Sequence, residues 1–166
     1  MYKCIAKDLT IESVNETITN IEGIHKAQKS SNDVNILIVE NQIFHHFPKG
    51  LDRSFPKVYH LDVNNSSLKA VTQDDMKMFP NLRHLYLRKN QIDVLPNNLF
   101  QQNPLLSFIN LDNNRIKQVA VNLFEPLTQL ISLSIENNDC IDGFALQEEP
   151  LRILIEEISK NCSLHA

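Results

Sequence analysis

Apolar residues recur along this chain with a constant period of about 24 residues. The clearest unit reads Leu82-x-x-Leu85-x-Leu87-x-x-Asn90-x-Ile92, and the same spacing continues without insertion on both sides of it. Five units share this register: Val34–Phe44, Val58–Leu68, Leu82–Ile92, Leu106–Ile116 and Leu130–Cys140. The Leu-x-Leu alternation predicts a short strand with apolar side chains on one face. Because one unit cannot bury its own apolar face, we expect the units to stack around a continuous core.

Residues between these segments recur with the same period. Pro56, Pro80 and Pro104 form one column, and Phe55 and Phe79 form another. The amide position is Asn90, Asn114 and Asn138 in the last three units, but Gln42 and Ser66 in the first two. A buried amide can satisfy backbone groups that a turn leaves unpaired, so we expect weaker bridging between the first two units.

These units resemble the leucine-rich repeat family over about residues 34–162. Phe79-Pro80-Asn81-Leu82 is similar to the extracellular "typical" subclass, and so is Leu95-Pro96 followed by Leu99-Phe100. The likeness extends to the short secreted leucine-rich-repeat proteins of insects. The resemblance implies an α/β solenoid, or horseshoe, in which each of five repeats places a parallel strand on the concave face.

The two ends depart from the repeat, so three parts are predicted: an amino-terminal cap at 1–33, the repeats at 34–139 and a carboxy-terminal cap at 140–166. Leu9, Ile11, Val14 and Ile18 alternate loosely and predict a β-rich first cap, formed by a hairpin or two turns. Apolar residues at helical spacing predict a helix in the last cap: Leu151, Leu154, Ile155 and Ile158, with Pro150 in its first turn.

The three cysteines bear on the cellular compartment. The resemblance implies a disulfide between Cys140 and Cys162, while two buried free thiols are the alternative. Cys4 is left over, which suggests intermolecular pairing, a free thiol or a missing partner. No apolar segment typical of a signal peptide follows Met1. Glycosylation motifs at Asn15 and Asn65, together with the paired cysteines, favour an extracellular over a cytoplasmic location.

Composition narrows the classes of function. The chain has 166 residues, which fits one domain, and a net charge of −4, which offers no basic footprint for nucleic acid. No apolar run is long enough to insert into a membrane. Its three glycines do not share a phosphate-binding loop.

The outward positions of the predicted strands supply the candidate site. A set of aromatic and charged residues gathers at the centre of this face, and we expect it to contact a protein partner: His60, His84, Tyr86, Arg88, Phe108 and Asp112. Exposed aromatic and arginine side chains on a rigid surface are typical of binding hot spots. The alternative is that the aromatics only stabilise neighbouring strands.

The sequence contains little evidence for a catalytic site or a metal site. His60 and His84 are expected on adjacent strands with Asp62 nearby, but zinc needs three or four ligands and no further Cys or His completes the set. No catalytic motif is present, and a shallow solenoid face rarely excludes water. We therefore expect no catalytic residue, metal or cofactor.

The sequence thus predicts a non-catalytic recognition module, with an immune, adhesion or receptor-like role implied by the resemblance. Two alternatives remain open. One is an intracellular leucine-rich-repeat adaptor or regulatory scaffold. The other is a self-assembling structural protein that forms a homodimer through Cys4 or an exposed flank.

Overall fold

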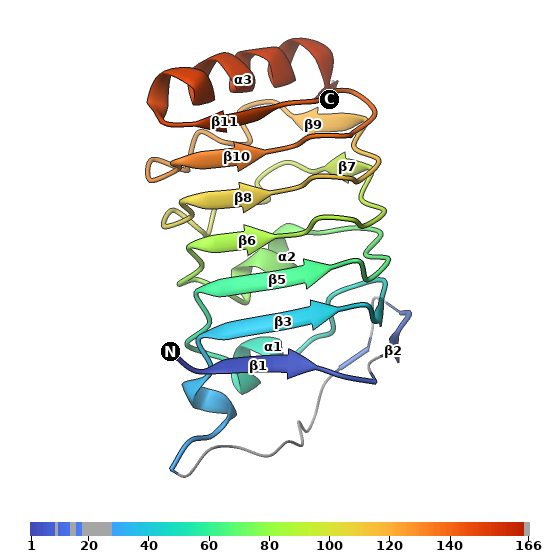
Figure 1. Cartoon of the computed structure of the whole chain (residues 1–166), viewed down its shortest axis with the longest axis vertical. Helices are drawn as coiled ribbons and strands as arrows, with labels where there is room; N and C mark the ends of the chain where they lie inside the picture. The colour runs from blue at the N-terminus through green and yellow to red at the C-terminus, as the bar shows by residue number, and fades with distance from the viewer. Residues whose placement is uncertain (9, 14–15, 18–27, 165–166) are drawn as a thin grey trace.

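A single row of strands runs the length of the molecule (Figure 1). The computed structural model describes the whole chain except residues 9, 14–15, 18–27 and 165–166. Seven strands form the main sheet, in the order β1 (Lys3–Ala6), β3 (Ile36–Glu40), β5 (His60–Asn64), β6 (His84–Tyr86), β8 (Phe108–Asn110), β10 (Ser132–Ser134) and β11 (Phe144–Leu146). All neighbours are parallel except β10 and β11, which are antiparallel.

The strand register confirms the predicted solenoid. Along the sheet, His60 lies opposite His84, His84 opposite Phe108 and Phe108 opposite Ser132, always one repeat apart. The other side of the solenoid carries shorter elements: β4 (Ile43–Phe44), α1 (Leu51–Ser54), α2 (Gln73–Lys77), β7 (Val94–Leu95) and β9 (Gln118–Ala120). Equal chain length per turn keeps the same position of every repeat in one straight row.

The core lies between these two sides and is built by the repeated apolar positions. Leu61, Leu85 and Leu87 are fully buried, as the Leu-x-Leu pattern predicts. Phenylalanine rings meet edge to face in the interior: Phe47 lies 5.2 Å from Phe44 of its own turn and 6.3 Å from Phe79 of the next turn, between ring centroids. Removing this apolar surface from water is the main stabilising contribution of the stack.

Asparagine side chains tie consecutive turns together. The Asn90 amide donates to the carbonyls of Val63 (2.7 Å) and Leu87 (2.9 Å), one in the preceding turn and one in its own. Its oxygen accepts from the backbone N–H groups of Ser66 (3.1 Å) and Leu68 (3.0 Å). These bonds satisfy backbone groups that the turn would otherwise bury unpaired.

The first two turns carry other residues at this position. The Ser66 hydroxyl lies 2.8 Å from the Asn64 carbonyl and 3.3 Å from the Val39 carbonyl of the preceding turn. The Gln42 amide donates to the carbonyls of Glu40 and Asn41, both within its own turn. A hydroxyl has one proton to share where an amide has two, which gives the lighter bridging that the sequence predicts.

A residue with left-handed backbone follows each strand of the repeat, directly after β3 and β5 and three residues after the ends of β6, β8 and β10. Five such positions recur once per repeat and have φ between 48° and 56°: Asn41, Asn65, Lys89, Asn113 and Asn137. Asparagine tolerates this conformation better than most side chains because its short amide can hydrogen-bond locally. The recurring asparagine therefore fixes where the chain leaves the sheet.

The amino-terminal segment differs from the prediction. Among the described residues no hairpin forms. Instead β1 pairs in parallel with β3, and β2 (Thr10–Ile11) pairs in parallel with β4. Cys4 lies opposite Leu37 and Ile11 opposite Phe44, a longer separation along the chain than the one between repeats. The longer spacing hides this turn from a search at one period. Leu9, Val14 and Ile18, which suggested the hairpin, lie outside the described residues.

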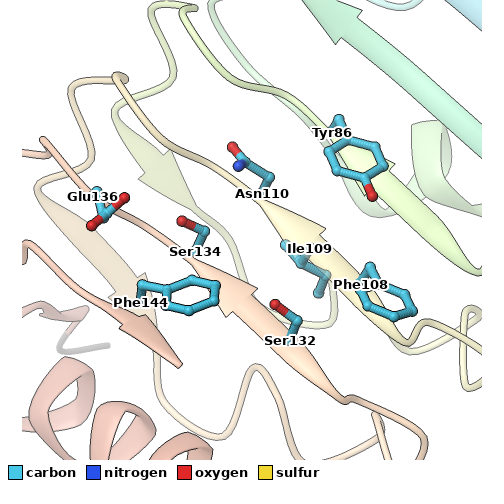
Figure 2. A pocket seen from close by; sticks show the side chains of 8 residues that line it. All are labelled: Tyr86, Phe108, Ile109, Asn110, Ser132, Ser134, Glu136 and Phe144. Carbon is cyan, nitrogen blue, oxygen red and sulfur yellow. The ribbon is translucent and has the colours of Figure 1, made fainter. Parts of the chain in front are cut away.

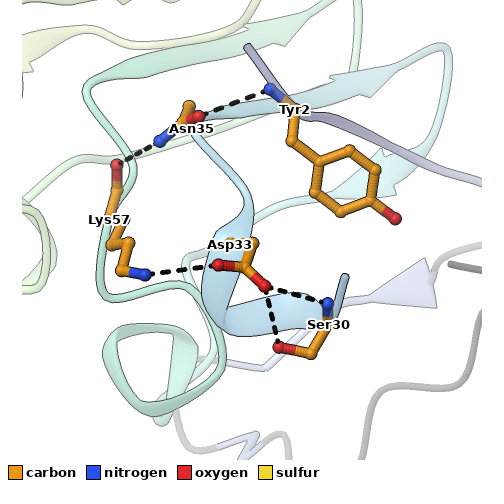
Figure 3. Close-up of polar contacts among 5 residues, drawn as sticks. All are labelled: Tyr2, Ser30, Asp33, Asn35 and Lys57. Carbon is orange, nitrogen blue, oxygen red and sulfur yellow. Dashed lines mark hydrogen bonds and ion pairs between the residues drawn. The ribbon is translucent and has the colours of Figure 1, made fainter. Parts of the chain in front are cut away.

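Polar contacts attach β1 to the first repeat (Figure 3). The Tyr2 backbone N–H donates to the Asn35 side chain at 3.3 Å, and the Asn35 amide donates to the Lys57 carbonyl at 3.5 Å. Lys57 also forms an ion pair with Asp33 at 3.3 Å, at the end of the short 3-10 helix η1 (Ser31–Asp33). A backbone hydrogen bond from Ser30, and then the bond from Lys57, lower the pKa of the partly exposed Asp33 carboxyl.

The carboxy-terminal end is covered by the predicted helix. α3 (Glu148–Asn161) buries Leu151, Leu154 and Ile158 and packs against β11 (Figure 1). Gly143 precedes β11, and a Cβ at that position would lie 2.5 Å from Cδ1 of Leu154. Glycine thus permits the close approach of helix and strand. The last strand, β12 (Ser163–Leu164), pairs with β9.

Candidate functional site

The solvent-facing side of the main sheet, here called the strand face, carries most of the predicted contact residues in two rows. The first row runs through Ile36, His60, His84, Phe108, Ser132 and Leu146. The second runs through Ile38, Asp62, Tyr86, Asn110, Ser134 and Phe144. Strands about 4.8 Å apart bring neighbours in a row into contact, so the predicted aromatic residues meet.

Ring contacts connect the aromatic residues of this face. His84 lies edge to face with Phe108, at 5.0 Å between ring centroids, and with His60 at 5.4 Å. The His60 ring is tilted by 32° to Tyr86 at 5.1 Å. Tyr59 reaches His84 edge to face at 6.3 Å. Each ring is half-buried by its neighbours, so the cluster presents a fixed apolar surface to solvent.

The two histidines share a hydrogen bond. Their Nδ1 atoms lie 3.3 Å apart, so one ring donates a proton and the other accepts it. Burial lowers the pKa of His60, and the charge of His84 and that of Lys3 lower it further. Burial, followed by the charge of Arg83, lowers the pKa of His84. The pair is therefore held neutral at neutral pH.

Arg88 and Asp112 each lie two residues after the end of a strand, β6 and β8 respectively, but only Arg88 has a charge that is free to bind a partner. Arg88 is exposed, and among the described residues its guanidinium has no ion-pair partner. The Asp112 carboxylate instead accepts hydrogen bonds from Asn110 Nδ2 (2.8 Å), Ser134 Oγ (2.6 Å) and the Glu136 backbone (2.8 Å). Its acceptor oxygens are thus engaged by its own chain, and Asp112 shapes the face more than it offers a free charge.

Asp62 is a partly buried carboxyl at the centre of the face. Its Oδ1 atom is buried and has no hydrogen-bond partner among the described residues. Burial raises the pKa of this carboxyl, an effect that the nearby charge of Arg88 opposes. A buried oxygen without a hydrogen-bond partner costs free energy, so Asp62 reduces the stability of the folded chain when it is ionised.

An open recess of about 350 Å³ lies at the carboxy-terminal end of the strand face (Figure 2). Its lining residues are Tyr86, Phe108, Ile109, Asn110, Ser132, Ser134, Glu136 and Phe144. Tyr86 and Phe108 belong to the predicted set, whereas Phe144 does not. Phe144 and Leu146 are 57% and 45% exposed on either side of the buried Ala145, an alternation that is visible in the sequence but too short to stand out.

A second residue that the sequence did not single out is Asn103. It is fully buried, and its amide donates to the carbonyls of Met76 (3.0 Å) and Phe79 (2.9 Å) in the preceding turn. Phe55 and Phe79 occupy the same column, so the change from phenylalanine to asparagine in the following repeat is the signal that could have revealed it. Its role is structural.

The cysteines fall into two environments. Cys140 and Cys162 are joined by a disulfide with a Cα–Cα distance of 5.3 Å, which links the last repeat to the residue after α3. Cys4 is a free thiol, half-buried at the position that leucine occupies in the next strand. Burial raises the pKa of the Cys4 thiol, which reduces its thiolate fraction and its reactivity toward a second chain.

The glycosylation motifs also differ in their surroundings. Asn65 is exposed, and its amide donates to Asn41 Oδ1 at 2.6 Å. Asn64, which begins an overlapping motif, is only 5% exposed and has no room for a glycan in the folded chain. Asn15 lies outside the described residues.

Metal-binding clusters and membrane-spanning helices are both absent from the described residues. No group of three or more His, Cys, Asp or Glu side chains could hold a metal ion there. Within the same part of the chain, no helix has the length and apolar character needed to cross a bilayer.

Comparison with known proteins places these features in context. Residues 56–116 match the leucine rich repeat family. A comparison with curated proteins found no match.

Solved structures show the same architecture. The LRIM1/APL1C complex is similar with a TM-score of 0.62 and 23% identity over 76% of this chain and 24% of that one. The APL1 leucine-rich repeat domain has a TM-score of 0.60 and 20% identity over 84% and 37%. The TLR13–ssRNA13 complex has a TM-score of 0.55 and 21% identity over 63% and 15%. The chain thus spans 24% and 37% of the length of the first two of these structures. Its fold is a leucine-rich-repeat solenoid.

Proposed function

We propose that this protein is a non-catalytic recognition module that binds a protein partner through its strand face. The observation that carries the proposal is the cluster of His60, His84, Tyr86 and Phe108, which touch one another on the solvent side of a hydrogen-bonded sheet. A surface held in place before binding loses little conformational entropy when a partner docks. Aromatic side chains of this kind supply much of the binding energy of protein interfaces.

The alternative, in which these aromatic residues only stabilise the sheet, explains fewer features of the strand face than partner binding does. Ring pairing explains why aromatics lie side by side. It does not explain the exposed Arg88 beyond the end of β6, whose guanidinium has no ion-pair partner among the described residues. A partner that supplies an acidic group to Arg88 would complete such a pair.

The test is the double substitution Tyr86→Ala with Phe108→Ala. Proteins retained by the immobilised native chain from its source fluid are identified, and their retention by the variant is compared. We expect at least about a tenfold loss of affinity, because two adjacent hot-spot side chains are removed. Val121→Ala is the matched control, since Val121 is exposed on the opposite side of the solenoid.

Folding of the double variant is checked by circular dichroism and urea unfolding. If every retained partner still binds the folded double variant as the native chain does, the strand face is not the binding surface. Equal losses in the Val121→Ala variant would point to nonspecific adsorption and would also contradict the proposal.

We further propose an extracellular location, and an immune, adhesion or receptor-like role. The disulfide between Cys140 and Cys162 supports it, because such bonds persist in oxidising compartments. Asn65 is exposed and is the glycosylation site that we expect to be occupied. Non-reducing peptide mapping of protein from its native source tests this. Free thiols and an unmodified Asn65 would instead favour the intracellular adaptor.

A further inference from the structure

We propose that the recess between β8 and β11 is an anchor pocket, which accepts one large apolar side chain of the partner with a lysine or arginine next to it. This inference rests on the proposed function of the strand face and names the chemistry of the ligand at one part of it. The residues that decide it are Phe108, Ser132, Glu136, Phe144 and Leu146.

Small residues create the recess. In the first row Ser132 lies between Phe108 and Leu146, and in the second Ser134 lies between Asn110 and Phe144. Strands β8 and β11 are two strand spacings apart, about 10 Å, so the larger side chains form walls and the serines form the floor. Figure 2 shows Ser132 between the rings of Phe108 and Phe144, with Ser134 beside Phe144. One aromatic or branched aliphatic side chain fits between such walls.

The outward side chains of β11 are unusually exposed for apolar residues. Phe144, which lines the recess, is 57% exposed, and Leu146, two residues further along the strand, is 45% exposed. Single exposed apolar residues are ordinary, but a group beside a recess marks an interaction site. An apolar ligand group would remove this surface from water.

The polar lining selects the charge of the ligand. The Ser134 hydroxyl donates its one proton to Asp112 at 2.6 Å, and the Asn110 amide donates one of its two N–H protons to the same carboxylate at 2.8 Å. The Glu136 side chain is exposed, and among the described residues its carboxylate has no ion-pair partner. A cationic side chain beside the apolar anchor complements this charge, whereas an acidic one is repelled.

The probe for the test is a phage-displayed library of random twelve-residue peptides, selected on the native chain. Enriched peptides are synthesised and their affinities measured on four proteins: the native chain and the variants Ser132→Tyr, Glu136→Gln and Val121→Tyr. Ser132→Tyr fills the recess without breaking a side-chain hydrogen bond within the described part of the chain. Val121→Tyr adds the same ring to the opposite side as a matched control.

We expect the enriched peptides to share a large apolar residue with a neighbouring lysine or arginine. Ser132→Tyr should weaken their binding about tenfold or more, while Val121→Tyr leaves it unchanged. Glu136→Gln should weaken the basic peptides about threefold and leave their neutral Gln analogues unaffected. Thermal unfolding of each variant verifies that it is folded.

Three outcomes overturn the pocket: no enriched peptide, enriched peptides without an apolar residue, or unchanged binding to Ser132→Tyr. The failure of the wider proposal looks different. Peptides that bind the Ser132→Tyr variant but lose affinity for His60→Ala would retain the strand face and reject the pocket. Peptides indifferent to both substitutions would reject both.

Discussion

At the scale of single residues, the contact between His60 and His84 couples the strand face to pH. The hydrogen bond between the two Nδ1 atoms requires a neutral acceptor, and both pKa values lie below the ordinary 6.5 because of burial. The pKa of His46, on the other side of the solenoid, is lowered for the same reason. In the unfolded chain all three take up a proton near pH 6.5.

The sign of the pH effect follows from these shifts. As the pH falls below about 6.5, the unfolded chain binds protons that the folded chain does not, so the free energy of unfolding decreases until the lowered pKa values are passed. We expect the double variant His60→Gln with His84→Gln to lose less stability between about pH 7 and pH 5 than the native chain. Urea unfolding at a series of pH values measures this. A native and a variant curve of equal slope would contradict it.

Asp62 works in the opposite direction. Burial raises its pKa above the ordinary 3.8, so its contribution to stability decreases as the pH rises through that higher value. The Asp62 effect begins at pH 3.8 and extends upward, and the histidine effect begins at pH 6.5 and extends downward, so the two act with opposite sign inside the interval between these values. The histidine variant keeps Asp62, so the difference between its curve and that of the native chain reports the histidines.

At the scale of elements, the disulfide holds α3 over the end of the stack. The bond joins residues 22 positions apart and leaves Cys162 2% exposed. We expect Cys140→Ala with Cys162→Ala to lower the free energy of unfolding by about 3 kcal/mol, because the unfolded chain regains the entropy of an open loop. Guanidinium unfolding checks the value.

Cys4→Ala serves as the control for the disulfide, since it removes a thiol but no covalent bond. We expect its effect to be the smaller of the two because Cys4 is only half-buried. If the double variant were as stable as the native chain, packing of Leu151, Leu154 and Ile158 alone would hold the helix.

Some of the helices and strands could be predicted from the sequence and others could not. The helix at Glu148–Asn161 follows from apolar spacing, and the strands from Leu-x-Leu alternation. Strand β11 has three residues and no repeat to identify it, and its antiparallel direction depends on how the chain reverses after β10. Phe144 of β11 forms one wall of the recess, so the recess could not be predicted from the sequence either.

At the scale of the whole molecule, stability should be graded along the stack. Each turn contacts only its neighbours, so β5, β6 and β8 are supported on both sides, whereas β1 has one neighbouring strand among the described residues. We expect amide hydrogen exchange to be slowest in these three central strands and fastest in β1. Mass spectrometry after deuterium labelling measures the order. Uniform exchange along all strands would show a single cooperative unit instead.

The same stacking explains how much of the whole fold the sequence predicts. Parallel turns of equal length require a constant spacing, so the single period of the sequence defines the strands from Ile36 to Ser134. The turn that contains Cys4 and Ile11 makes the same kind of contacts at a longer spacing. A periodic search misses it, because only the strand register reveals the extra length.

The straight rows of the sheet also matter for changing what the protein recognises. Outward residues one repeat apart lie side by side on neighbouring strands. The residues that alternate with them along each strand face the core, so the outward residues can be substituted without repacking the interior. Exchanging His60, His84 and Phe108 alters one row, and exchanging Asp62, Tyr86 and Asn110 alters the next. Selection or engineering can therefore change the specificity of the strand face by substituting one outward position at a time.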